Sequence, residues 1–452
     1  MVEALTSYIP RGSAVRTPAG KKGGGLSRIG AVKLQTAVIN ASIEKSGIPR
    51  EIAPDVISEI IGTCATQTGK EQGNNFTGMS SEKSGLMVPA ATVNMLCASG
   101  GQGIRYGAGL VSSGMDEAVL VAGAENNHLV FHGQDLMPNA SALGELIRNL
   151  IRTIKKGPKI INDSLPSDYK LFVMGRYADE MAKVLKIPVE RLNEYGFLSQ
   201  MRATEAQRLG KFDDEMVPIV TPYGIVSRDE GIRPDTTLEA LKKLPFKFGK
   251  TIPLWGIPFF PFTKFGTKKG FHTPGTSSQV SAQGAALVLT NGYVVRDYDL
   301  KSLAKIKATA IVKTNSQDLV EHLLGPIPAI EKVLNKANLK PQDIDLWEIN
   351  EAFAAVVLAA VDKFKLDINK VNVNGGAIAL GHALGVSGVR LPVTVLHEME
   401  RRSQEGLPSK YALATLCVGG GQGIAMIFER CDEDEFLKIK NLPHEAKNFS
   451  TH

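Results

Sequence analysis

Hydrophobic positions recur at two spacings along the chain, and the two spacings alternate. In residues 29–46 the apolar side chains lie three or four positions apart, which predicts a helix with one buried face. Residues 56–62 form a short, mostly apolar run that is typical of a buried strand. A strand, a helix and a strand follow at residues 91–94, 99–113 and 118–123. This order predicts a parallel sheet with helices packed on it.

The same alternation of helix-like and strand-like patterns occurs near the C-terminus. Helical spacing marks one segment after residue 328 and two more on either side of a glycine-rich turn, and short apolar runs mark three strands. The expected helices are residues 328–337, 352–363 and 386–400, and the expected strands are residues 346–349, 412–416 and 423–428. Two α/β halves are therefore expected.

The stretch between the halves differs from them in composition and pattern. Residues 128–271 carry more charge, longer helical patterns and frequent prolines, so we expect a loop domain inserted over one face. The N-terminal half then comprises residues 1–127 plus 272–296, and the C-terminal half comprises residues 297–452.

Two segments of the insertion have unusual composition. Residues 143–156 form an apolar stripe with a basic edge, which suits packing on the insertion itself and leaves a membrane-surface or partner contact open. Residues 252–262 are too rich in proline for a helix and too apolar for an exposed loop. We expect a buried loop there, with a subunit interface or a substrate-tail pocket as alternatives.

Composition and charge narrow the class of protein. Of the 452 residues, 43% are hydrophobic and 22% are charged, which is typical of a globular protein and excludes a disordered or collagen-like chain. The formal net charge is +6, but no segment combines a dense basic face with aromatic side chains. Nucleic acid is therefore excluded as a partner.

Cysteine spacing and the length of apolar runs bear on the compartment. Cys64, Cys97, Cys417 and Cys431 are far apart and form no CxxC pair, so we expect free thiols in a reducing compartment. No apolar run has the length of a signal peptide or a membrane span. We expect an intracellular protein, in the mitochondrion of a eukaryote or the cytoplasm of a bacterium.

Cys97 lies in a glycine-rich turn between an expected strand and an expected helix. Free backbone N–H groups and the positive end of the helix dipole stabilise a thiolate at such a position. The sequence therefore predicts a lowered thiol pKa and a nucleophilic sulfur. A small buried cysteine without chemistry is the alternative.

Three further turns carry reactive side chains. His382 stands among small residues before an expected helix, where an imidazole can act as a base. Cys417 follows an expected strand in a turn with Gly419, and Asn350 and Glu351 open a helix directly after another strand. Taken alone, Asn350 and Glu351 indicate no more than a cap at the N-terminus of that helix.

In this order the four segments resemble the signature blocks of the thiolase family. The matching blocks are a Cys-x-Ser turn at Cys97, an Asn-Glu-Ala-Phe turn at Asn350, a Gly-His turn at His382 and a Cys-x-Gly turn at Cys417. Further similar segments are residues 14–18, 229–234 and 277–281. The resemblance implies a five-layer αβαβα sandwich of two similar halves with an inserted loop domain, assembled as a homodimer or homotetramer.

The resemblance also implies a role for three side chains. Cys97 is the nucleophile that becomes acylated, and His382 takes the proton from Cys97 or from the attacking coenzyme A (CoA) thiol. Cys417 protonates the departing acetyl-CoA carbanion or, in the synthetic direction, removes a proton from acetyl-CoA. Two thiols are needed because one sulfur cannot be the acylated nucleophile and the acid at once.

Two oxyanion holes are implied in the same way. Asn350 holds a water that binds the thioester oxygen together with His382, and the backbone N–H groups of Cys97 and Gly419 surround the acyl-enzyme carbonyl. Each preorganised donor contributes on the order of 3 kcal/mol in the transition state. Glu351 helps to orient this network.

The resemblance implies CoA as a co-substrate, with no tightly bound cofactor and no metal. Arg233, Ser278 and Met174 match positions near CoA. Two departures stand out: Ala383 replaces the proline that usually follows the histidine, and the loop around Ser278 is one residue longer before Gly284. Activity should survive the first departure, because alanine adopts the same φ as proline.

Three features bear on substrate preference. Residues 277–281 and the long insertion with its basic amphipathic stretch resemble broad-chain degradative thiolases and the thiolase subunits of β-oxidation complexes. Val173 precedes Met174, where acetoacetyl-specific thiolases generally have a histidine. We therefore expect a degradative 3-ketoacyl-CoA thiolase of fatty acid β-oxidation, an acyltransferase that cleaves 3-oxoacyl-CoA to acetyl-CoA and a shortened acyl-CoA. An acetoacetyl-CoA thiolase running in the synthetic direction is the alternative.

Cys417 disfavours a condensing enzyme of the fatty-acid synthase type. The presence of all four residues, Cys97, His382, Cys417 and Asn350, disfavours a non-catalytic subunit with the thiolase fold. A hydratase-dehydrogenase partner protein stays open.

Overall fold

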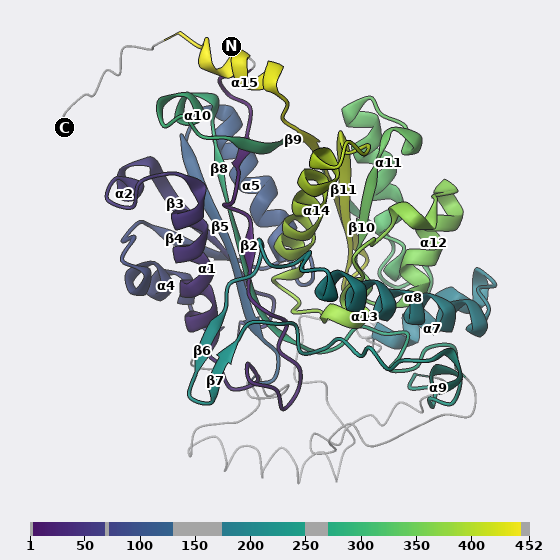
Figure 1. The fold of residues 1–452 in the computed structure, drawn as a ribbon. Coiled ribbons are helices and arrows are strands. Elements are labelled where there is room, and N and C mark those ends of the chain that lie inside the picture. The colour runs from purple at the N-terminus through teal and green to yellow at the C-terminus, as the bar shows by residue number, and fades with distance from the viewer. Residues whose placement is uncertain (1–2, 68–71, 130–173, 249–269, 444–452) are drawn as a thin grey trace, which may run out of the picture.

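The computed structural model describes residues 3–67, 72–129, 174–248 and 270–443 of the chain (Figure 1). Its N-terminal half starts with two short strands and then alternates helices with strands. The elements are β1 (Tyr8–Pro10), β2 (Val15–Arg16), α1 (Ala31–Ser46), α2 (Ala53–Val56), β3 (Ile57–Thr63), α4 (Phe76–Ser84), β4 (Ala90–Val93), α5 (Ser99–Ser113) and β5 (Ala118–Asn126). Segments 143–156 and 252–262, whose packing the sequence left open, lie outside the described residues.

The described part of the expected insertion is mainly helical. Its elements are α7 (Met174–Val184), α8 (Val189–Arg208), β6 (Ile219–Thr221), β7 (Gly224–Val226) and α9 (Leu238–Lys242). After it the chain returns to the N-terminal half, because β8 (Ala282–Thr290) pairs antiparallel with β5, β1 and β2. A short helix, α10 (Gly292–Asp297), then leads out of this half.

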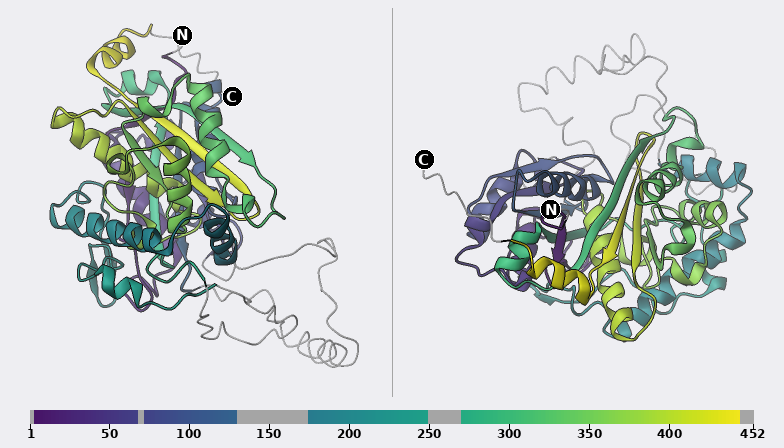
Figure 2. Two further views of the ribbon diagram at one scale, coloured as in Figure 1. Left: turned by 90° about the vertical axis from the view of Figure 1, so that its right-hand side faces the viewer. Right: turned by 90° about the horizontal axis from the view of Figure 1, so that it is seen from above.

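The C-terminal half repeats the alternation of strands and helices. Its elements are β9 (Ser302–Lys313), the 3-10 helix η2 (Glu321–Leu323), α11 (Pro326–Ala337), η3 (Pro341–Asp343), β10 (Leu346–Ile349), α12 (Ala354–Phe364), η4 (Ile368–Lys370), α13 (Ala377–Leu380), α14 (Ser387–Gln404), β11 (Tyr411–Val418), β12 (Gln422–Arg430) and α15 (Glu433–Lys440). Helix α15 lies beside the start of the chain (Figure 2), where the Tyr8 hydroxyl donates a hydrogen bond to Glu435 at 3.0 Å.

The strands form a mixed sheet, not the parallel one that the sequence pattern predicted. Within the described residues the sheet has ten strands, in the order β10-β11-β12-β9-β1-β8-β5-β3-β4 with β2 beside β8. Pairing is parallel for β3 with β4 and β5 and for β10 with β11, but antiparallel around β8, β9 and β12. The reason is connectivity: residues 419–421 join β11 to β12, and so short a turn permits only a hairpin.

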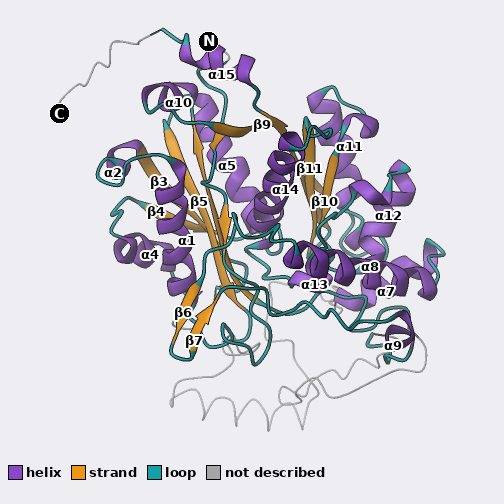
Figure 3. Cartoon of the chain, viewed as in Figure 1, coloured by secondary structure: helices purple, strands orange, loops and turns teal. Residues whose placement is uncertain are grey.

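Helices and strands alternate in five layers. Helices α5 and α14 lie between the strands of the N-terminal half and the strands of the C-terminal half (Figures 1 and 3). Helices α1 and α4 cover the outer face of the first group of strands, and α11 and α12 cover the outer face of the second. The central layer is held by one apolar cluster that draws on both helices and on both groups of strands. Its members include Ile104 and Val111 of α5, Val389 and Val393 of α14, Leu287 of β8 and Ile424 of β12. This is the sandwich that the sequence predicted.

The two central helices approach each other closely at their N-terminal ends. A Cβ at Gly100 of α5 would lie 2.6 Å from the backbone nitrogen of Val389 in α14, and a Cβ at Gly388 would clash with the backbone nitrogen of Gly101. Only glycine leaves room for this contact. As a result, the turn before α5 and the loop before α14 meet at one end of the molecule's core. No helix among the described residues has the length and apolarity needed to cross a membrane.

Candidate active site

Cys97 is presented by a strained turn between β4 and α5. The preceding residue, Leu96, has a φ of 48°, which is uncommon for a residue with a side chain. Ser99 holds the turn closed, since its hydroxyl donates to the Leu96 carbonyl at 2.7 Å and accepts from the Met95 N–H at 2.9 Å. The Cys-x-Ser spacing thus has a physical purpose: the serine fixes the cysteine.

The protonation of Cys97 differs from the sequence expectation. The thiol is partly exposed, but burial of much of its surroundings raises the Cys97 pKa to about 11. Hydrogen bonds from the backbone N–H groups of Gly419 and of Cys97 itself favour the thiolate and reduce this effect. The expected lowering of the pKa is therefore wrong, because desolvation outweighs the turn. Cys97 is a neutral thiol at neutral pH and needs a base.

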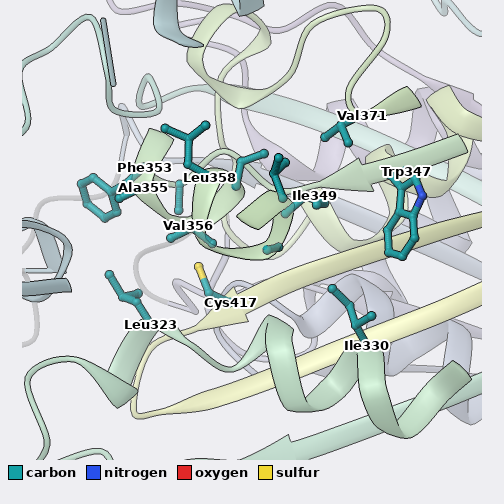
Figure 4. Close-up of a cluster of buried hydrophobic side chains, with 14 of the residues drawn as sticks. Leu323, Ile330, Trp347, Ile349, Phe353, Ala355, Val356, Leu358, Val371 and Cys417 are labelled. Atoms are coloured by element: carbon teal, nitrogen blue, oxygen red, sulfur yellow. The ribbon is translucent and has the colours of Figure 1, made fainter. Parts of the chain in front are cut away.

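The second thiol comes from the β11–β12 hairpin. Cys417 lies at the end of β11, buried against apolar side chains of α12 such as Val356 (Figure 4). Burial raises the pKa of Cys417 well above its usual range, and the nearby Cys97 raises it further. Two residues later, Gly419 brings its N–H to the sulfur of Cys97. The hairpin thus joins a proton-bearing thiol and a hydrogen-bond donor to the nucleophile.

His382 is a neutral base whose tautomer is set by the helix that follows it. The Ser387 hydroxyl donates to the Ala383 carbonyl at 3.0 Å, so it accepts the hydrogen of His382 Nδ1 at 2.6 Å. The lone pair of Nε2 is then available to take a proton. Burial lowers the pKa of His382 to about 3, and the buried Arg390 guanidinium contributes to this shift.

Asn350 lies beside this base. Its Nδ2 is 3.4 Å from Nε2 of His382, and its backbone N–H donates to the Thr415 carbonyl, two residues before Cys417. The buried Oδ1 of Asn350 accepts no hydrogen bond from the described residues. This oxygen is the kind of acceptor that a water or a substrate group satisfies.

Glu351 supports the site and does not face the reacting atoms. Its carboxylate accepts from the Tyr195 hydroxyl and the Ser199 hydroxyl, both at 2.7 Å, and from the Ile378 N–H at 2.9 Å. Asn372 donates to the same carboxylate at 3.1 Å. Glu351 thus ties the turn of Asn350 to α8 and α13, which makes it a positioning residue.

Sequence reasoning missed a second carboxylate with a similar task. The fully buried Glu125, at the end of β5, accepts from the backbone N–H groups of Thr66 at 3.0 Å and of Gly385. The loop of His382 is thereby anchored to the N-terminal half. Glu125 carried no signal in the sequence because its partners are distant in the chain. Ser387 carried none because no local pattern shows that a serine in the first turn of α14 faces His382.

The three expected CoA contacts lie at different places. Met174 begins α7 with its sulfur 4.0 Å from where a Cβ at Gly419 would stand, so it borders the site. The Ser278 N–H donates to the Ala352 carbonyl at 3.0 Å, which joins its loop to the turn after Asn350. Arg233 is exposed, and its backbone is hydrogen bonded: its N–H donates to Gln200 at 2.9 Å, and its carbonyl accepts from the Thr236 hydroxyl at 2.8 Å.

In the part of the chain that the structure describes, no group of three or more histidine, cysteine or acidic side chains is arranged to hold a metal ion. All four cysteines are free thiols. The chemistry that the arrangement supports is carried by thiol, imidazole and amide groups. Such a set is suited to moving an acyl group through a cysteine thioester.

A five-layer sandwich with a thiol, a neutral imidazole and a second thiol defines a class of acyl-transferring enzymes. Comparison with known proteins makes this specific: the model of the thiolase N-terminal domain matches residues 12–252, and that of the thiolase C-terminal domain matches residues 300–430. The chain belongs to the thiolase family and is an acyltransferase. The family resemblance predicted from the four turns is confirmed.

Similar proteins differ in their named substrates. An acetyl-CoA acetyltransferase of Cupriavidus necator is 35% identical over 425 residues, covering 92% of this chain and 98% of that protein. A beta-ketoadipyl-CoA thiolase of Pseudomonas knackmussii is 34% identical, and a 3-ketoacyl-CoA thiolase of Bacillus subtilis is 32% identical, with coverage of 92% and 93% of this chain and 98% of each relative. The crystal structure of human mitochondrial 3-ketoacyl-CoA thiolase superimposes with a TM-score of 0.77 at 31% identity, covering 95% of this chain and 100% of that one.

Proposed function

We propose that this enzyme is a 3-ketoacyl-CoA thiolase that cleaves 3-oxoacyl-CoA with CoA, giving acetyl-CoA and an acyl-CoA shortened by two carbons. The observation that carries the proposal is the contact of Cys97 with the Cys417–Gly419 hairpin, together with the neutral His382 paired to Asn350, whose backbone N–H is bonded to Thr415 two residues before Cys417. The similarity of the fold to that of a human mitochondrial 3-ketoacyl-CoA thiolase supports it.

The first half of the reaction cleaves the substrate. Nε2 of His382 takes the proton of Cys97, and the thiolate attacks the 3-oxo carbon. The bond between C2 and C3 breaks, the electron pair stays on C2, and Cys417 gives its proton to that carbon. Acetyl-CoA leaves, and the proton on His382 passes to the Cys417 thiolate. The acyl group is now a thioester of Cys97, and both proton carriers are reset.

The second half transfers the acyl group to CoA. His382 takes the proton of the CoA thiol, the CoA thiolate attacks the acyl-enzyme carbonyl, and the C–S bond to Cys97 breaks. The proton then returns from His382 to Cys97. The N–H groups of Cys97 and Gly419 donate to the oxyanion at this carbonyl, and a water on Asn350 together with His382 serves the other oxyanion.

A chain-length series tests the proposal. Thiolysis rates of acetoacetyl-CoA, 3-oxohexanoyl-CoA and 3-oxododecanoyl-CoA are measured on wild type, Cys97→Ala and Cys417→Ala. We expect turnover of the longer substrates by wild type and losses of at least about a thousandfold in both variants, because nucleophile and acid are each indispensable. Activity confined to acetoacetyl-CoA would replace the proposal with the acetoacetyl-CoA thiolase, which the 35% identity to an acetyl-CoA acetyltransferase favours. Unchanged CoA-dependent release in Cys97→Ala would contradict the mechanism.

We also propose CoA as the co-substrate, β-oxidation as the context and a homodimer or homotetramer as the assembly. A solved thiolase neighbour of 31% identity carries CoA, which supports the first part. Light scattering of the purified protein tests the assembly, and a monomer would contradict it. Subcellular fractionation tests the expected location in the mitochondrion or bacterial cytoplasm.

A further inference from the structure

His322 is a buried imidazole beside the active site to which the reaction described above gives no task. It lies in η2, between β9 and α11, and its exposed fraction is 5%. The sequence pattern around it predicts no role. Both of its ring nitrogens are nevertheless hydrogen bonded, and one of them is bonded to the turn that contains Gly419.

The two hydrogen bonds fix the tautomer of His322. Nδ1 is 2.9 Å from the Ser316 carbonyl, which only accepts, so Nδ1 carries the hydrogen. Nε2 accepts from the backbone N–H of Gly420 at 3.0 Å, so Nε2 carries none. The imidazole is therefore neutral, and its unprotonated nitrogen points at the turn between β11 and β12.

The turn has few other ways to keep its shape. Gly420 and Gly421 have φ angles of 81° and 70°, which suit glycine alone. The end of β9 and the residue after it hold their carbonyls: Lys313 Nζ donates to Gly420, and the Thr314 N–H donates to Gly421 at 2.7 Å. Among the described residues, His322 is thus the acceptor that holds the Gly420 N–H, the amide next to Gly419.

Helix α7 secures the imidazole from the other side. The Tyr177 ring stacks on His322 with centroids 3.8 Å apart and an interplanar angle of 19°. One turn earlier on the same helix, Met174 lies next to Gly419. His322 thus sits between α7 and the hairpin and couples their positions.

We propose that His322 is a positioning residue for the reaction: by accepting the Gly420 N–H, it fixes the orientation of the neighbouring Gly419 N–H that stabilises the oxyanion at Cys97. The inference rests on the proposed function. Preorganised donors work only when they are aimed before the charge develops, so a loosened turn costs rate and not substrate affinity.

The environment keeps His322 in the form that this task needs. Burial lowers the pKa of His322, and the cationic Lys313 at the end of β9 adds to the effect. Tyr177 of α7, Glu321 of η2 and Asp318, whose carbonyl accepts the His322 backbone N–H at 3.2 Å, are further titratable residues beside it, and residues 418–422 of the turn contribute none. Protonation would place an N–H of His322 against the N–H of Gly420, which repels the turn.

Two substitutions separate acceptor from bulk. His322→Gln keeps an oxygen that reaches the Gly420 N–H, whereas His322→Met has similar volume and no comparable acceptor. His397→Met is the matched control, because His397 is also a buried imidazole, 2.8 Å from the Ala14 carbonyl and on α14. All variants are measured as the full chain, with thermal unfolding to establish that they are folded.

The readouts are thiolysis kinetics and hydrogen exchange of the peptide spanning residues 418–422. For His322→Met we expect a fall in kcat on the order of tenfold, an unchanged KM and faster exchange of the turn, while His322→Gln stays within about threefold of wild type. His397→Met leaves kcat and turn exchange unchanged. Wild-type kcat and exchange in His322→Met would overturn the inference while the proposed function stands. A wild type that cannot cleave 3-oxoacyl-CoA would overturn the proposed function, and turn exchange would then still decide whether His322 holds the hairpin.

Discussion

At the scale of single residues, burial decides which groups hold protons in the site. The turn of Cys97 offers N–H groups that stabilise a thiolate, yet desolvation raises the Cys97 pKa to about 11. Desolvation also lowers the pKa of His382 to about 3. Both groups are neutral at pH 7. In the proposed mechanism the enzyme therefore starts from a thiol and a free base, not from an ion pair, and we expect the proton to move when substrate arrives.

Ser387 is expected to control how well the base works. Ser387→Ala removes the acceptor for the His382 Nδ1 hydrogen at 2.6 Å, so the ring loses the bond that fixes its tautomer and orientation. We expect kcat to fall on the order of tenfold with little change in KM. Steady-state kinetics check this, with Ser403→Ala near the other end of α14 as the control. A Ser387→Ala enzyme with wild-type kcat would show that His382 needs no such support.

His382 should also make the protein sensitive to acid. In the unfolded chain its pKa returns to the usual 6.5, so between pH 6.5 and about 3 the unfolded state binds a proton that the folded state does not. As the pH falls through this window, the free energy of unfolding therefore decreases, and His382 contributes up to about 1.4 kcal/mol per pH unit to the decrease. Urea unfolding at pH 6 and pH 4 should show a smaller loss for His382→Gln than for wild type. Equal losses would contradict the low pKa.

At the scale of elements, packing of α5 against α14 brings the turn of Cys97 to the loop of His382. In Gly388→Ala the added methyl group would clash with the backbone at Gly101, where no flexible side chain can move away. We expect a loss of about 1–3 kcal/mol in the free energy of unfolding, together with lower activity because the two turns shift.

The control substitution lies in α5, the helix against which Gly388 of α14 packs. Gly109 of α5 has open space around the position of a Cβ, so Gly109→Ala should stabilise the protein by roughly 0.5–1 kcal/mol through lower backbone entropy of the unfolded chain. Denaturant unfolding compares the two. If Gly388→Ala is tolerated as well as Gly109→Ala, the close crossing does not position the site.

Elements with clear periodicity could be predicted from the sequence, and their pairing could not. Helix α5 and strand β10 begin and end where the hydrophobic pattern places them. The pattern did not identify β8 and β9, whose antiparallel pairing turns the expected parallel sheet into a mixed one. Pairing depends on neighbours that are distant in the chain, such as β8 beside β5, and local periodicity carries no information about them.

The same division holds for the site. Cys97, His382, Cys417 and Asn350 stood out because reactive groups in glycine-rich turns are rare in the sequence. The residues that position them, such as Glu125, could not be predicted from the sequence. The role of a buried carboxylate at the end of a strand depends on which N–H groups donate to it in the folded chain. Local chemistry is thus visible in the sequence, and its orientation is a property of the fold.

At the scale of the whole molecule, one buried guanidinium ties the N-terminal strands to the inserted stretch. Arg16 of β2 is fully buried and donates to Glu215 at 2.6 Å and to both carboxylate oxygens of Asp229 at 2.8 and 2.9 Å. Asp229 also accepts the Ala19 N–H at 2.7 Å. The path from α8 back to β8 is therefore fastened to the core by charge.

Replacement of this guanidinium should destabilise the whole protein. Arg16→Met keeps much of the volume but leaves two buried carboxylates without a cation, and an uncompensated buried charge costs about 3–5 kcal/mol. Denaturant unfolding at pH 7 measures the loss, and Arg208→Met serves as the control because its pair with Glu205 is exposed to solvent and should contribute little. If Arg16→Met were as stable as Arg208→Met, the inserted stretch would be held instead by apolar contacts such as those of the buried Phe212 in its cluster with Ala379 and Leu380, and the buried charges would serve specificity rather than stability.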